Sequence, residues 1–198
     1  MTDILFSKES FSTIAILLTF AAFYPYFKGM FQGVTRPHAF SWIIWAFGTV
    51  IVFIAQLSDG AGIGAWPIGL SGLLTFGVAG LAYLKQGDRR FVRSDWIFLV
   101  LAASALPLWF VTNTALSAVL VLTLADLLGF GPTVRKAYHL PYEENAALFA
   151  IGALRNGFVI LALEHYSWTT ALFPAAVGMA CVLFVFVIFA RRTASPRA

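Results

Sequence analysis

The sequence predicts an all-α polytopic membrane protein with seven transmembrane helices in a 3+1+3 plan, two parallel three-helix repeats joined by one inverting helix. An apolar composition, a one-sided distribution of basic residues and an internal repeat of prolines carry this prediction. Of 198 residues, 60% are hydrophobic and only 11% are charged, against about 25% charged in an ordinary soluble domain. A soluble fold of this length could not bury so much apolar surface, whereas a bilayer requires no such burial.

The spans follow from the length of the apolar segments, since about 20 apolar residues are needed to cross a hydrocarbon core of roughly 30 Å. The apolar run from 96 to 130 would be ~50 Å long as one helix, too long for a single crossing. The polar triplet Thr112-Asn113-Thr114 provides a turn in its middle. We therefore divide the single membrane domain 1–198 into seven spans at 11–27, 39–57, 62–84, 96–111, 115–130, 145–163 and 168–190.

The basic residues support both the number of spans and their orientation. Of the 13 Lys and Arg residues, all but Lys8 and Arg155 fall on one side of the seven spans. Because Lys-rich and Arg-rich loops stay in the cytoplasm, we expect the N-terminus outside and the C-terminus inside, in the plasma (inner) membrane. These loops account for the net charge of +4, so nucleic acid is not expected as a partner.

Prolines mark the internal repeat. Three pairs recur in order, two at an offset of 107 and one at an offset of 104: Pro25 with Pro132, Pro67 with Pro174, and Pro37 with Pro141. A proline in or beside a spanning helix removes a backbone hydrogen bond, so such a series is not expected by chance. The repeats cover 11–84 and 115–190, and the helix 96–111 between them makes them parallel. Transporters built from parallel repeats bind their solute near the midplane, between the repeats.

This plan resembles the SWEET sugar transporters and the wider PQ-loop group. A repeat of that group has a proline low in its first helix, a basic loop, and a polar and aromatic start to its second helix. The first half matches at Pro25, Lys28 to Arg36 and Phe40-Ser41-Trp42, and the second at Pro132, Arg135-Lys136 and Glu143 to Asn145. The resemblance covers nearly the whole chain and implies a small-solute transporter or facilitator. Tyr26 stands where the PQ-loop has glutamine, so we do not infer sugar.

Two ionisable residues, Asp126 and Arg155, lie inside predicted spans, where a charge is costly and marks a functional candidate. Their repeat counterparts are the uncharged Thr19 and Ile51, so both charges occur in one half only. This pattern predicts an ion pair, because a partner offsets much of the cost of a buried charge. Three roles stay open: a static clasp between helices, a gate or proton-sensitive latch, and contact of Arg155 with an anionic solute.

Other side chains are candidates to line a solute cavity: Trp42, Trp45, Phe149, Asn156, Gln56 and Ser71. Trp42 and Trp45 share a face of one helix, and Phe149 matches Trp45 in the repeat, which predicts an aromatic on each wall. Interfacial anchoring and packing is the alternative role of the tryptophans. Pro25 and Pro132 are candidate hinges, with fixed kinks as the alternative.

Enzyme chemistry is not expected, because no Ser/His/Asp arrangement, HExxH motif, P-loop or GxGxxG fingerprint occurs. We expect no cofactor and no metal. The expected partners are the lipid bilayer and a small solute (sugar, vitamin-like or small organic anion), and a homo-oligomer stays open. The competing function is a non-transporting receptor or a scaffold subunit of a larger membrane complex. A polar, aromatic-lined cavity between the repeats would favour transport, and a dry interface would favour the alternative.

Overall fold

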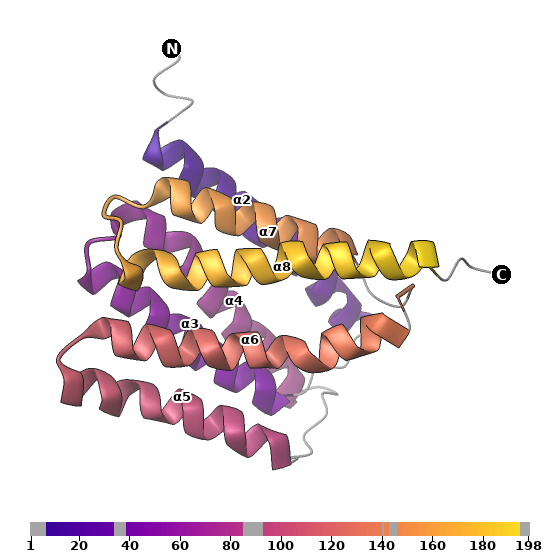
Figure 1. The fold of residues 1–198 in the computed structure, drawn as a ribbon, viewed down its shortest axis with the longest axis horizontal. Helices are drawn as coiled ribbons and strands as arrows, with labels where there is room; N and C mark the ends of the chain where they lie inside the picture. Colours follow the sequence, from indigo (N-terminus) through magenta and orange to yellow (C-terminus); the bar gives the residue numbers. More distant parts are fainter. Residues whose placement is uncertain (1–6, 34–38, 85–92, 140, 143–145, 195–198) are drawn as a thin grey trace.

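The protein is all-helical in the part of the chain that the computed structural model describes, residues 7–33, 39–84, 93–139, 141–142 and 146–194. Seven α-helices and one 3₁₀ helix form one bundle (Figure 1): α2 (Lys8–Phe31), α3 (Ala39–Ser58), η1 (Gly62–Ala65), α4 (Trp66–Leu84), α5 (Arg93–Thr112), α6 (Ala115–His139), α7 (Ala146–Ala162) and α8 (Trp168–Ala194).

Each apolar segment predicted from the sequence is helical over its described residues, except at Leu163, since α7 ends at Ala162. The polar triplet does separate α5 from α6, and its middle residue, Asn113, has a φ of 51°. Asparagine adopts this left-handed conformation more readily than most residues, so the turn follows from local chemistry. Two helices are longer than the apolar segments that predict them, since α6 continues to His139 and α8 to Ala194.

The helices are those of a membrane protein. Four stretches are long and apolar enough to cross a membrane, namely α2, α3, η1 with α4, and α8; the shorter apolar helices are Leu99–Thr112, Ala115–Phe130 and Ala146–Ala162. Large hydrophobic side chains cover the outside of the bundle, with Phe110 79% and Phe186 71% exposed. A water-soluble protein rarely exposes apolar patches of this extent, whereas lipid chains solvate them.

The helices pack as two groups of similar layout. In the first helix group (α2, α3, η1 and α4), α4 lies against both α2 and α3. In the second helix group (α6, α7 and α8), α8 lies against both α6 and α7. The groups meet where α2 packs on α7 and α3 packs on α6, and α5 lies against α6 and α3. Successive helices run along the long axis of the bundle in alternating directions (Figure 1).

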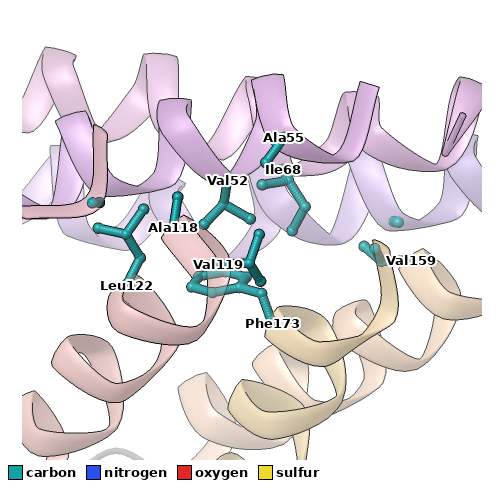
Figure 2. Close-up of a cluster of buried hydrophobic side chains, with 10 residues drawn as sticks. Val52, Ala55, Ile68, Ala118, Val119, Leu122, Val159 and Phe173 are labelled. Carbon is teal, nitrogen blue, oxygen red and sulfur yellow. The ribbon is translucent and has the colours of Figure 1, made fainter. Parts of the chain in front are cut away.

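We name the two ends of the bundle by the residues found there: α2, α4, α6 and α8 begin at the Lys8 end and finish at the Arg191 end. From the Lys8 end to mid-height, the two groups share a core. Figure 2 shows it, with Val52 and Ile68 of the first group against Val119, Val159 and Phe173 of the second. A smaller shared cluster of Ala61, Ala65 and Leu163 lies nearer the Lys8 end.

Toward the Arg191 end, each group has a core of its own. In the first group Met30, Ala39, Val78 and Ala82 pack together, and in the second Ala137, Phe184 and Ile188 do so. Among the described residues, the buried apolar clusters that join the two groups therefore lie at the Lys8 end and at mid-height.

Candidate functional site

Arg155 of α7 connects the second helix group to the first. Its Nε donates to Thr19 Oγ1 of α2 at 3.1 Å, and its Nη2 donates to the carbonyl of Pro67 in α4 at 2.8 Å. Its Nη1 donates to Asn156 Oδ1 at 3.4 Å. Thr19 is 1% exposed and donates its own hydroxyl to Ala15 O. Hydrogen bonds from a charged donor are worth about 1.5–3 kcal/mol each, so Arg155 stabilises the contact between the groups.

Asp126 of α6 lies on the other contact, where α3 packs on α6. Within the described ranges its carboxylate has no hydrogen bond and no ion pair, and it interacts with Arg155 only at longer range. The direct ion pair that the sequence predicts is therefore not formed in this structure. The physical reason is direction: the guanidinium of Arg155 extends to α2 and α4, whereas Asp126 faces a cavity beside α3.

That cavity lies between the two helix groups and has a volume of about 20 Å³, enough for one or two water molecules. Helices α3, α5, α6 and α8 line it, and most of its wall is apolar: Ile44, Trp45, Gly48, Thr49, Ala102, Leu122, Ala125, Asp126 and Phe173. A Cβ placed on Gly129 would lie 3.5 Å from Cζ2 of Trp45, so the indole covers α6 one turn beyond Asp126. The cavity is too small for a large solute in this conformation, and Thr49 and Asp126 are the polar side chains in its wall.

Only one of the three predicted aromatic residues reaches this cavity. Trp42 packs inside the first group, its ring centroid 4.9 Å from that of Tyr26. Phe149 packs inside the second group, 4.4 Å from Phe184. Phe149 is therefore not the aromatic of the second wall, because its ring packs on α8; Phe173 of α8 lines that wall instead. The alternative role, packing, describes Trp42 and Phe149.

Gln56 lies on the contact between the groups but not in the cavity. It is 0% exposed, and its Nε2 donates to the carbonyl of Thr170 at 2.6 Å. That carbonyl is available because Pro174, four residues further along α8, has no N–H to donate. No hydrogen bond to Gln56 Oε1 is present in the described chain.

The remaining predicted residues lie elsewhere. Asn156 donates to Gly152 O of its own helix at 2.9 Å and packs against Gly178 of α8. Ser71 is half-buried on α4, and Pro25 is exposed inside α2. The side chain of Pro132 lies outside the described residues. The hinge role of both prolines stays a prediction.

Contacts that the sequence did not suggest close the Lys8 end. The carboxylate of Glu164 accepts from the backbone N–H of Ile63 at 3.0 Å, and Ser167 Oγ donates to the carboxylate of Asp59. The backbones of η1 and α7 also approach closely, since a Cβ on Gly64 would lie 2.7 Å from Leu163 N. The only sequence signal was the glycine-rich stretch from 60 to 64.

No cluster of three or more His, Cys, Asp or Glu side chains that could hold a metal occurs among the described residues. The polar side chains between the two helix groups can therefore act through hydrogen bonds and charge. In comparisons with protein-family models, curated proteins and solved structures, none matches this chain.

Proposed function

We propose that the chain is a small-solute transporter or facilitator that works by alternating access between two three-helix bundles. The bundles are the first and second helix groups, and α5 is the helix that inverts the chain between them. All seven helices span the membrane, including the three shorter apolar ones. The Arg191 end faces the cytoplasm, because Lys and Arg concentrate on that side of the chain. This is the activity that the resemblance to SWEET and PQ-loop transporters implies.

Paired contacts support the two-repeat plan. Helices α2 and α6 begin at Lys8 and Ala115, so their starts differ by 107 residues. The α2–α7 contact is matched by the α3–α6 contact, in which each helix is replaced by its counterpart. A two-fold axis between parallel repeats produces this exchange.

Individual side-chain contacts repeat at the same offset. The ring of Phe23 lies 6.4 Å from that of Trp42, and Phe130 lies 6.2 Å from Phe149. In this pairing the counterpart of Phe149 is Trp42 instead of Trp45. The offset of 104 that the sequence suggested for the second helix of each repeat is thus replaced by 107.

One observation carries the transport proposal: the two bundles contact each other unevenly along their length. Buried apolar clusters join them at the Lys8 end and at mid-height, whereas each bundle has its own cluster toward the Arg191 end. Between these levels lie Asp126, Arg155 and a small cavity. Alternating access requires an interface that closes on one side of a central polar site, so this arrangement supports a conformation closed to the outside.

A reversible cross-link tests the proposal. In a Cys181→Ala background, which removes the only cysteine, Asp59→Cys with Ser167→Cys would join the bundles at the Lys8 end. A matched control keeps Cys181 and adds Gly152→Cys, which joins α7 to α8 within the second bundle, where a Cβ on Gly152 would lie 3.3 Å from Cys181 Sγ.

Each protein is reconstituted in liposomes and assayed for uptake of labelled sugars, vitamins, organic acids and small organic cations. We expect oxidation to stop uptake in the Asp59/Ser167 pair, reduction to restore it, and the control pair to transport in both states. Unchanged uptake with the Asp59/Ser167 cross-link formed would refute alternating access. No uptake of any solute class by the unmodified chain would favour the receptor or scaffold alternative.

A further inference from the structure

The offset of 107 relates the two polar sites between the bundles to each other. It pairs Arg155 with Gly48, and it pairs the hydrogen-bond acceptor of Arg155, Thr19, with Asp126. In the α2–α7 contact the guanidinium of Arg155 meets Thr19 at 3.1 Å. In the matching α3–α6 contact, Gly48 and Asp126 line the same cavity. A long cationic side chain on one side thus corresponds to a hollow on the other.

Both sites carry groups that accept hydrogen bonds from a cation. Where Arg155 binds, the acceptors are a threonine hydroxyl and the carbonyl of Pro67. At the hollow, the hydroxyl acceptor is replaced by the stronger carboxylate of Asp126, and the hydroxyl-bearing Thr49 also lines the wall. A carboxylate accepts charge-assisted hydrogen bonds, which are roughly twice as strong as neutral ones.

Arg155 interacts with this carboxylate only at longer range and does not pair with it. No ion pair or hydrogen bond reaches Asp126 within the described ranges, and Arg155 is held by the opposite bundle. A charged group in a membrane interior is expensive unless it is paired, and it marks a substrate or ion pathway by default. The indole of Trp45 also lines the cavity, and an aromatic face attracts a cation.

We infer that the cavity at Gly48 and Asp126 binds the guanidinium or primary ammonium group of a small organic cation, through its N–H donors, in the place that the side chain of Arg155 takes in the other repeat. The volume of about 20 Å³ receives the N–H end of such a group in place of one or two water molecules and excludes a whole sugar ring in this conformation. The cationic class replaces the sugar, vitamin-like and anionic classes that the sequence left open. Identification of the cation as the transported solute rests on the proposed function, whereas binding does not.

Thermal unfolding of the purified full chain in detergent measures binding without transport. The probe is methylguanidinium, compared at equal ionic strength with methylurea, which has a similar shape but no charge, and with tetramethylammonium, which has the charge but no N–H donor. At ten times its Kd, methylguanidinium should raise the unfolding midpoint by about 3–6 °C. The two control compounds should give no saturable rise.

Two substitutions locate the effect. Asp126→Asn should abolish the response to methylguanidinium. Gly48→Arg should abolish it as well, because the new guanidinium fills the cavity. The new Cβ would lie 3.3 Å from one methyl group of Leu122, a tight contact that requires this side chain to shift by a few tenths of an ångström. Gly48→Arg should also lower the unfolding midpoint less when Asp126 is present than when Asn stands at position 126.

The inference is overturned if methylguanidinium gives no saturable shift, if either control compound shifts the midpoint equally, or if the response persists in Gly48→Arg. Should Asp126→Asn fail to fold, Gly48→Arg alone decides. Binding of methylguanidinium without uptake of any solute would refute the proposed function and retain the site. Uptake of an uncharged solute without methylguanidinium binding would refute the site and retain the proposed function.

Discussion

Gly64 lies where the two helix groups approach most closely at the Lys8 end, and Gly64→Ala should force them apart. The added Cβ would lie 2.7 Å from the Cα and N of Leu163 and 2.8 Å from the carbonyl carbon of Ala162. Carbon atoms in favourable contact are about 3.5–4.0 Å apart, so the overlap is close to 1 Å. The overlapping atoms are backbone atoms, which cannot rotate away.

The expected cost is that of overpacking a well-packed core, about 1–3 kcal/mol. For a chain of this length, this lowers the midpoint of thermal unfolding by roughly 2–12 °C. The same energy acts on the conformation closed at the Lys8 end. It would shift the equilibrium toward a conformation open at that end by about 5–150-fold.

Thermal unfolding in detergent gives the first measurement. The second is the rate at which a maleimide labels Ala61→Cys in the Cys181→Ala background, since Ala61 is buried at the Lys8 end. The matched control is Gly157→Ala, because a Cβ at Gly157 meets no atom within 4 Å. A helical glycine replaced by alanine gains up to about 1 kcal/mol. Equal stability and equal labelling in the two variants would show that the close approach of η1 to α7 does not hold the groups together.

Three further outcomes follow from the contacts between the groups. A double-mutant cycle of Arg155→Met and Thr19→Val should give a coupling energy of about 0.5–3 kcal/mol in unfolding free energy, and additive losses would contradict the 3.1 Å hydrogen bond. Gln56→Leu should cost about 1–3 kcal/mol because a buried carbonyl of α8 loses its donor. Adding Pro174→Ala should recover part of that loss by restoring a helical N–H, and no recovery would exclude the missing N–H as the reason for the contact. Cys181 is 5% exposed and should react with maleimide only after unfolding, so fast labelling of the native chain would contradict the packing of α8.

Much of the architecture follows from local sequence. The apolar segments locate every helix, because a backbone in lipid must satisfy its hydrogen bonds within a helix. The turn between α5 and α6 follows from a polar triplet centred on Asn113. A proline within a helix indicates which carbonyl loses its N–H donor. At Thr170 the replacement donor is Gln56, which comes from a helix distant in the sequence.

The partners of buried polar groups were not predictable in the same way. Arg155 was paired with Asp126 on the ground of charge alone, yet it binds a hydroxyl and a main-chain carbonyl. Position along a helix gives the depth of a side chain, but its direction around the helix axis is known only relative to its own neighbours. Which helix stands opposite is decided by packing between segments far apart in the chain.

The sequence by itself determined the membrane class, the helical segments and the positions inside them at which a charged side chain costs free energy. Only the tertiary structure favours Gly48 over Ile51 as the counterpart of Arg155 in the proposed repeat, because the starts of α2 and α6 and the ring contacts share one offset. It also decided that the carboxylate of Asp126 faces a hollow. The physical reason is that a cavity is a property of several helices at once, and no single segment of the sequence records the absence of a side chain from a neighbour.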